Sequence, residues 1–252
     1  MLITGREISK TEKERAYAKA TPAKNDVIIR LRDVWKIYQM GETEVIALQG
    51  LTLDIRRGEF VSIMGPSGSG KSTAMNMIGC LDVPTRGSIF LDGENISNMT
   101  ESELAQIRGK MIGFIFQQFN LIGTLTAIEN VMLPMTFQNV SFSERVRRAT
   151  QLLELVGLGE RLNHRPLELS GGQQQRVAIA RSLANDPEVI LADEPTGNLD
   201  SKSGENVIDF LKKLHQNEGK TIVMVTHDEN LAKNAERIEY LRDGKIIKTV
   251  KI

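Results

Sequence analysis

The chain has 252 residues, with 32 Lys and Arg against 32 Asp and Glu, so its formal net charge is zero. Hydrophobic residues make up 40% of the sequence, which excludes an intrinsically disordered protein and allows one large domain or two small ones. The balanced charge lacks the excess of cations on which recognition of a nucleic-acid backbone depends, so we expect no nucleic-acid partner.

The sequence also indicates the cellular compartment of the protein. Its apolar runs fall far short of the ~20 residues that a helix needs to cross a bilayer. The N-terminus has no apolar segment followed by a small-residue cleavage site, and the single cysteine, Cys80, cannot form an internal disulfide. We therefore expect residence in the cytoplasm. Residues 1–26 are polar and of mixed charge, and we expect a disordered N-terminal extension there, before a folded body over residues 27–252.

Short apolar runs dominate the folded body from residue 27 onward. Residues 51–55 alternate apolar and polar side chains, a pattern typical of a strand with one covered face. The runs at residues 60–64, 189–192 and 222–225 are continuously apolar apart from Ser62, which suits strands buried on both faces. These runs predict a parallel sheet covered by helices.

Helical and turn signals lie between and after these strands. Ser141 and Glu144 have the spacing of a capping box, and the residues that follow show apolar side chains at helical spacing. A second apolar stripe begins at Val207. Asp243 and Gly244 separate two apolar segments near the C-terminus, which predicts a two-residue β-hairpin.

The first motif that carries chemistry follows the strand at residues 60–64. It matches G-x-x-x-x-G-K-[ST] and runs into a predicted helix, so strand, loop and helix come in the order of a phosphate-binding loop. In such a loop, backbone N–H groups and the helix N-terminus surround phosphate oxygens. We expect Lys71 to reach the β and γ phosphates and Ser72 to bind Mg²⁺. The motif comprises Gly65, Pro66, Ser67, Gly68, Ser69, Gly70, Lys71, Ser72 and Thr73.

Two adjacent carboxylates, Asp193 and Glu194, end the apolar run at residues 189–192. Ligands of open parallel sheets bind at this edge, where the strands end. We expect Asp193 to hold Mg²⁺ through its water shell and Glu194 to accept a proton from attacking water. The alternative, an ordinary solvated turn, stays open for the pair taken alone. Together with the phosphate loop, the pair indicates nucleotide hydrolysis.

A third motif, LSGGQ, spans residues 169–173. Ser170 is a natural N-cap for the apolar helix that follows, and Gly171 and Gly172 leave room for close approach to its N-terminus. The first residues of this helix, Gln173 among them, could bind an anion. A plain capped helix explains the same residues.

The three motifs in this order resemble the ATP-binding subunit of ATP-binding cassette (ABC) transporters. Ser170 lies 99 residues after Lys71 (170 − 71) and 23 before Asp193 (193 − 170), which fits an inserted helical subdomain. The resemblance implies an α/β fold: a P-loop NTPase core with a parallel sheet, an antiparallel β subdomain, and a helical subdomain at about residues 118–184.

The resemblance also implies roles for further residues. Tyr38 would stack on adenine, although a core or edge-strand tyrosine is the alternative. Gln117 would contact Mg²⁺ and the attacking water, with Gln118 as the adjacent alternative in register. Residues 197–200 would cross a dimer interface, and His227 would contact the γ phosphate.

Within the family, the sequence is most similar to MacB- and LolD-type ATPases, which serve macrolide export and lipoprotein release. This similarity implies an ATPase with ATP and Mg²⁺ that pairs head to tail with a second copy. It further implies a separate membrane permease, with or without a periplasmic or extracytoplasmic adaptor, and a peripheral position on the inner face of the cell membrane. An FtsE-like mechanical complex and a soluble ABC ATPase without a transporter are the alternatives.

Overall fold

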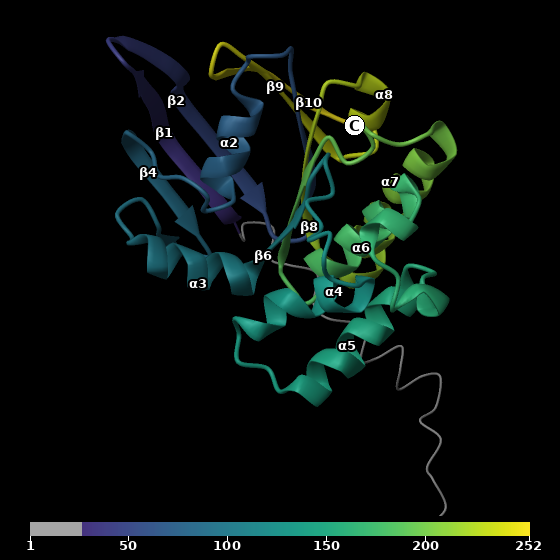
Figure 1. The fold of residues 1–252 in the computed structure, drawn as a ribbon. Coiled ribbons are helices and arrows are strands. Elements are labelled where there is room, and N and C mark those ends of the chain that lie inside the picture. The colour runs from purple at the N-terminus through teal and green to yellow at the C-terminus, as the bar shows by residue number, and fades with distance from the viewer. Residues whose placement is uncertain (1–26) are drawn as a thin grey trace, which may run out of the picture.

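The structure, a computed structural model, describes residues 27–252 (Figure 1). The extension predicted at residues 1–26 lies outside the described residues.

Six strands form the central sheet, in the order β10-β9-β3-β8-β7-β6. All neighbours pair in parallel except β10, which pairs antiparallel with β9 at one edge. The three apolar runs seen in the sequence are β3, β7 and β8, which are buried along almost their whole length, so the predicted parallel sheet is confirmed. The strands are β3 (Phe60–Met64), β6 (Ile112–Ile115), β7 (Val189–Asp193), β8 (Thr221–Thr226), β9 (Arg237–Arg242) and β10 (Lys245–Lys251).

A second, antiparallel sheet lies beside the first, at the left of Figure 1. Its order is β2-β1-β4-β5. The predicted alternation appears in β2, where Leu51, Leu53 and Ile55 are buried and Thr52 is exposed. The strands are β1 (Val27–Met40), β2 (Thr43–Arg56), β4 (Arg86–Leu91) and β5 (Glu94–Asn95).

Alternate residues of the central strands face two different hydrophobic cores. Val61 and Ile63 of β3 belong to the core shared with the antiparallel sheet and α2 (Lys71–Ile78), whereas Phe60 belongs to the core shared with the helices on the other face. Because successive side chains of a strand point to opposite faces, burial on both faces explains why the three runs are continuously apolar.

The remaining helices follow the order of the chain. Figure 1 shows α4, α5 and α6 grouped together, away from the antiparallel sheet. The predicted subdomain boundary at residues 118–184 stays a prediction. The helices are α3 (Glu101–Met111), α4 (Ala127–Thr136), α5 (Phe142–Leu155), α6 (Gly171–Ser182), α7 (Ser201–Glu218) and α8 (Glu229–Ala232), with short 3-10 turns at η1 (Gly159–Arg161) and η2 (Pro166–Glu168).

The capping box predicted at Ser141 is only half formed. Ser141 Oγ accepts a hydrogen bond from the backbone N–H of Glu144 at 3.4 Å. The Glu144 carboxylate does not return the bond to Ser141, because it accepts from Arg147 Nε at 2.9 Å instead. A complete box begins α4, where Thr126 and Glu129 exchange both bonds. The hairpin at Asp243 and Gly244 is confirmed, with φ angles of 48° and 72°.

Candidate nucleotide site

The phosphate-binding loop connects the end of β3 to the start of α2. Gly70 has a φ of 97°, and a Cβ there would lie 2.5 Å from the Ala47 carbonyl oxygen, so no other residue fits. Gly70 is also the N-cap of α2, where no side chain caps the helix and no acidic residue occupies the first turn. The first N–H groups of α2 are therefore open to an anion.

Two members of the loop support it instead of facing the cavity. A Cβ on Gly65 would lie 2.1 Å from the Leu241 carbonyl oxygen, so β9 packs directly against the loop backbone. Ser69 is buried, and its carbonyl oxygen accepts from the Gly244 N–H at 2.9 Å. The β9–β10 hairpin thereby supports the phosphate-binding loop on the side that faces away from the cavity.

The Lys71 ammonium is held over the same loop. Its Nζ donates to the carbonyl oxygens of Gly65 and Pro66, each at 2.8 Å. A cation is thus placed beside the open N–H groups of α2, and both attract a phosphate group.

The two carboxylates at the end of β7 lie in different environments. Burial raises the pKa of Asp193, and the charge of Glu194 raises it further, while Lys71 opposes both effects. Glu194 has a left-handed backbone, with a φ of 43°. Its carboxylate accepts from the backbone N–H of His227 at 3.0 Å, from His227 Nδ1 at 2.7 Å and from Thr226 Oγ1 at 3.3 Å.

The exposure of the His227 and Glu194 side chains differs strongly. Glu194 is 16% exposed, whereas His227 is 72% exposed. Since the carboxylate accepts, the short contact between them places the proton of the ring on Nδ1. The other ring nitrogen of His227 stays available at the surface of the site.

These parts surround one cavity of about 790 Å³, which we call the sheet-edge cavity. It brings together most of the predicted site: the loop, Asp193, Glu194, His227 and Gln117. Gln118 is not among its lining residues, so the placement favours Gln117 in that register. The lining residues are Val45, Ile46, Ala47, Pro66, Ser67, Gly68, Gly70, Lys71, Ser72, Thr73, Gln117, Asp193, Glu194, Val225 and His227.

Gln117 is fixed against the loop that follows β7. Its carbonyl oxygen accepts from Asn198 Nδ2 at 2.8 Å. A Cβ on Gly197 would lie 2.7 Å from Gln117 Nε2, so the glycine makes room for the Gln117 side chain. Asp200, the last residue of this loop, caps α7 by accepting from the Ser203 N–H at 3.0 Å.

The LSGGQ motif lies apart from the sheet-edge cavity. Ser170 caps α6, and Gln173 returns the bond to the Ser170 N–H at 2.9 Å, which forms a complete capping box. The four residues Ser170, Gly171, Gly172 and Gln173 are described by the structure, and none of them lines the cavity. One chain therefore presents this helix start elsewhere on its surface.

Tyr38 also lies outside the cavity lining. Its hydroxyl donates to Asp82 Oδ2 at 3.0 Å, and Lys36 Nζ lies 4.9 Å from its ring centroid. Its predicted stacking role stays a prediction. The apolar wall formed by Val45, Ile46 and Ala47 could not be predicted, because only the structure shows that Val45 and Ile46 are exposed and line the cavity.

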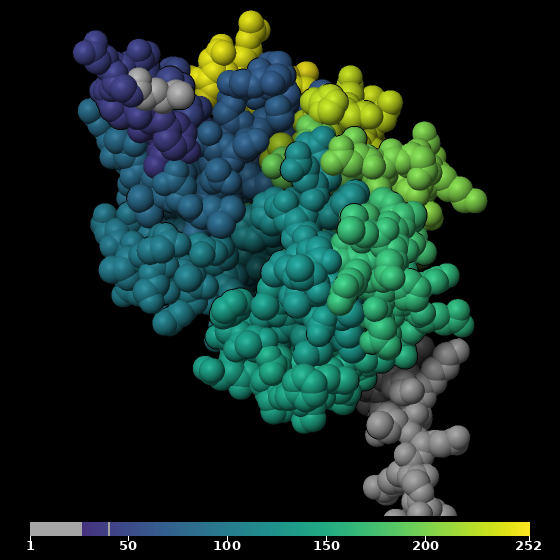
Figure 2. All heavy atoms as spheres, viewed as in Figure 1, coloured from purple at the N-terminus to yellow at the C-terminus, as the bar shows by residue number. Residues whose placement is uncertain are grey.

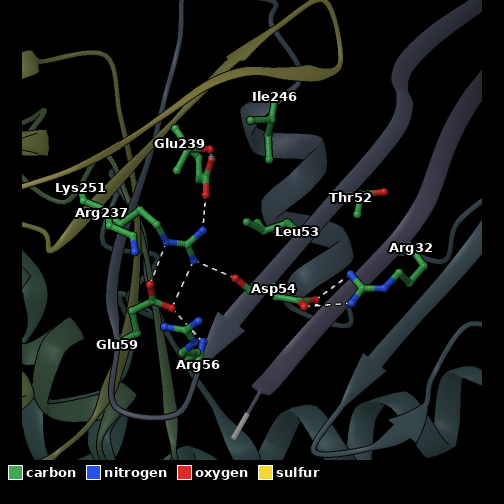
Figure 3. Close-up of a pocket in the computed structure, with 11 residues that line it drawn as sticks. Arg32, Thr52, Leu53, Asp54, Arg56, Glu59, Arg237, Glu239, Ile246 and Lys251 are labelled. Atoms are coloured by element: carbon green, nitrogen blue, oxygen red, sulfur yellow. Dashed lines mark hydrogen bonds and ion pairs between the residues drawn. The ribbon is translucent and has the colours of Figure 1, made fainter. Parts of the chain in front are cut away.

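A separate charged pocket of about 360 Å³ lies between β2 and the β9–β10 hairpin (Figure 3). Arg237 donates to Glu59 Oε1 at 2.8 Å and to the Asp54 carbonyl oxygen at 2.7 Å, and it contacts the buried Glu239 carboxylate. Arg32 donates twice to the Asp54 carboxylate, at 2.7 and 2.9 Å. The arginines and the carboxylates in this pocket neutralise one another. Their hydrogen bonds connect the antiparallel sheet to the central sheet.

Across residues 27–252, no helix is both long enough and apolar enough to span a bilayer.

Comparisons with known proteins agree with this geometry. The family model described as "ABC transporter" matches residues 48–197. The chain is 55% identical over 229 residues to the uncharacterized ABC transporter ATP-binding protein MJ0796 of Methanocaldococcus jannaschii, covering 89% of this chain and 97% of that protein. A solved dimer of MJ0796 in a post-hydrolysis state, bound to ADP and Pi, has a TM-score of 0.83 at 53% identity and covers 88% of this chain and 98% of that chain.

A further relative confirms the predicted subgroup. The chain is 53% identical over 220 residues to the macrolide export ATP-binding/permease protein MacB of Brucella melitensis. That match covers 87% of this chain and 34% of MacB, so the chain spans about a third of that relative. The chain belongs to the ABC transporter family, in which it is an ATP-binding cassette.

Proposed function

We propose that this cassette, an ATPase, closes with a second copy of itself head to tail around ATP, and that this closure drives a separate membrane permease. The observation that carries the proposal is the separation of two anion-binding helix starts. The start of α2 opens into the sheet-edge cavity, whereas the Ser170 start of α6 lies outside its lining. A second copy placed head to tail would bring its Ser170, Gly172 and Gln173 to the open side of this cavity.

ATP favours the closed pair by a differential interaction. Only a nucleotide with a γ phosphate would contact both the phosphate loop of one copy and the Ser170 helix of the other. A shift from mostly open to mostly closed needs roughly 5 kcal/mol of preference, which two nucleotides with several charge-assisted hydrogen bonds each can supply. Hydrolysis removes the bridge, and the pair reopens.

The hydrolytic roles follow from the sheet-edge cavity. Glu194 is the general base, because its carboxylate lines the cavity and three hydrogen-bond donors fix its position there. His227 contacts the γ phosphate through the ring nitrogen that Glu194 leaves available. Lys71 turns from the loop carbonyls to the β and γ phosphates, and Tyr38 stacks on the adenine as the chains close.

The donor set of the cavity fits Mg²⁺. Ser72, Gln117 and Asp193 all line it and offer hydroxyl, amide and carboxylate oxygens, the ligands that Mg²⁺ prefers. Few protein oxygens are needed, since Mg²⁺ keeps several waters and binds the substrate phosphates as well. When bound, the ion would neutralise charge that develops on the phosphates.

The Glu194→Gln variant tests the catalytic assignment. It should bind a fluorescent ATP analogue as wild type does, while turnover falls at least about 100-fold, because the amide cannot accept the proton of the attacking water. Glu229→Gln, an exposed carboxyl two residues beyond His227, is the matched control and should keep full turnover. Wild-type turnover in Glu194→Gln would exclude Glu194 as the base.

The permease has a candidate docking groove of about 680 Å³ between α3 and α4. Figure 2 shows a recess between the spheres of α3 and those of α4 and α5. Aromatic side chains line the groove at Phe114, Phe116 and Phe137, and the chain segment between β6 and Asn120 connects it to Gln117. We assign this groove to a cytoplasmic segment of the permease, which places the cassette on the inner face of the membrane. An extracytoplasmic adaptor, where present, would bind the permease.

Phe137→Arg tests the groove. Phe137 is 74% exposed and lines it, so an added charge should abolish sedimentation with membranes from the native cells while ATP binding persists. Phe142→Arg is the matched control, because Phe142 is 66% exposed and lies outside the groove. Equal behaviour of the two variants would refute the groove as the docking site.

A further inference from the structure

Arg181, in the last turn of α6, reaches the chain segment that follows Gln117. Its Nη2 donates to the Phe119 carbonyl oxygen at 2.8 Å, and its Nη1 donates to the Asn120 carbonyl oxygen at 2.5 Å. Arg181 and Phe119 are 62 positions apart in the chain. Because guanidinium donors have a fixed fork geometry, two bonds from one group define the position of both carbonyls.

The segment that Arg181 contacts has a strained backbone. Phe119 and Asn120 are both left-handed, with φ angles of 52° and 50°. Asn tolerates this conformation, whereas a bulky aromatic residue there is a true outlier. Strained residues of this kind persist where surrounding contacts determine them, and Arg181 supplies two such contacts.

The same segment contacts the other end of α6. The tip of the Phe119 ring lies 3.9 Å from the position that a Cβ on Gly171 would occupy, next to Ser170. α6 has 12 residues, so the segment touches a helix of about 18 Å near both of its ends. Arg181 and Asn120 also line the groove between α3 and α4, whereas Gln117 lines the sheet-edge cavity.

We propose that Arg181 is a positioning residue that holds the Gln117 segment against α6 and thereby aligns the Gln117 side chain in the sheet-edge cavity with the Ser170 start of that helix. The inference rests on the proposed function, since it assigns Arg181 an effect on turnover through Gln117. Arg181 itself does not line the cavity. Its loss should therefore change the rate of hydrolysis more than nucleotide affinity.

Arg181→Met and Arg181→Lys test this role in the full chain. We expect Arg181→Met to lower kcat about 10-fold or more, with KM changed less than about three-fold, because misplacement of a catalytic side chain acts on the transition state. Arg181→Lys keeps a cationic donor and should recover part of kcat. It replaces Arg181→Met as the test variant if Arg181→Met does not fold. The control is Arg148→Met, since Arg148 donates to the Leu183 carbonyl oxygen just past the end of α6 and not to the Gln117 segment.

Amide hydrogen exchange separates positioning from a merely structural role. In Arg181→Met, exchange should accelerate at residues 117–120 and stay unchanged along α6. Acceleration along the whole of α6 together with an equal loss in Arg148→Met would overturn the proposal. So would wild-type kcat in Arg181→Met.

A double-mutant cycle with Gln117→Ala distinguishes this inference from the function on which it rests. If Arg181 acts through Gln117, the double variant should be no slower than Gln117→Ala alone. Losses that multiply would overturn the positioning role and leave the role of Gln117 intact. A Gln117→Ala variant with full turnover would overturn the role of Gln117, and the inference with it.

Discussion

Asp193 and Glu194 are adjacent in the chain, yet their surroundings assign them to different tasks. The raised pKa of Asp193 has burial as its main cause, which means that its charge is poorly solvated when no cation is present. Glu194 is surrounded by three donors instead. The strand end thus offers one carboxylate that a nearby cation would stabilise and one whose oxygens already accept three hydrogen bonds.

This difference predicts the effect of Asp193→Asn on stability. A carboxyl whose pKa is raised in the folded state keeps its proton there at a pH where the unfolded chain has lost it, so its charge costs stability above that pH window. Removal of the charge should raise Tm at pH 7 by about 1–2 °C, a small effect because solvent screens a partly exposed group. Mg²⁺-dependent ATP binding should weaken in the same variant.

Differential scanning calorimetry at pH 7 and at pH 3.5 checks this expectation. The gain in Tm should be present at pH 7 and shrink at pH 3.5, where the Asp193 carboxyl is mostly protonated in both states. Asp209→Asn, an exposed aspartate on α7, should leave Tm unchanged at both pH values. A lower Tm for Asp193→Asn at pH 7 would contradict the account.

Residues that belong to a recognisable motif were predictable from the sequence, and residues that reach the site only through the packing of the fold were not. Lys71 and Ser72 follow from the loop motif, because strand, glycines and helix are contiguous. Val45 and Ile46 reach the same cavity from β2, and only the packing of the antiparallel sheet against the loop brings them there. No pattern near Arg181 predicts its bonds to the carbonyls of Phe119 and Asn120.

At the scale of elements, the strands could be predicted from the sequence. A strand buried on one face alternates apolar and polar residues, and a strand buried on both faces is continuously apolar. The helix caps show the limit of such reasoning. Ser141 and Glu144 have the required spacing, but Arg147 competes for the Glu144 carboxylate. Thr126 and Glu129 have the same spacing, no arginine within residues 27–252 is hydrogen-bonded to Glu129, and both bonds form.

Alanine substitutions of the two caps should differ in cost. Thr126→Ala loses a cap with two reciprocal bonds and should lower the free energy of unfolding by about 1 kcal/mol, and Ser141→Ala should cost about half of that. Urea denaturation followed by circular dichroism measures both. Equal costs would show that the bond returned by Glu129 adds no stability.

At the scale of the whole molecule, the parallel sheet places its strand ends at one edge, and the phosphate loop, the carboxylates and His227 meet there. The Ser170 start of α6 belongs to the group of helices α4, α5 and α6, and it does not line this cavity. Sequence order predicted both motifs, while their separation within one chain is a property of the fold.

The most direct test is the oligomeric state of Glu194→Gln with saturating ATP and Mg²⁺, measured by small-angle scattering and size exclusion. We expect a dimer with ATP, a monomer without nucleotide, and a monomer with ATP when Ser170→Arg is added. Single chains under saturating ATP, or a dimer that Ser170→Arg leaves intact, would contradict this expectation.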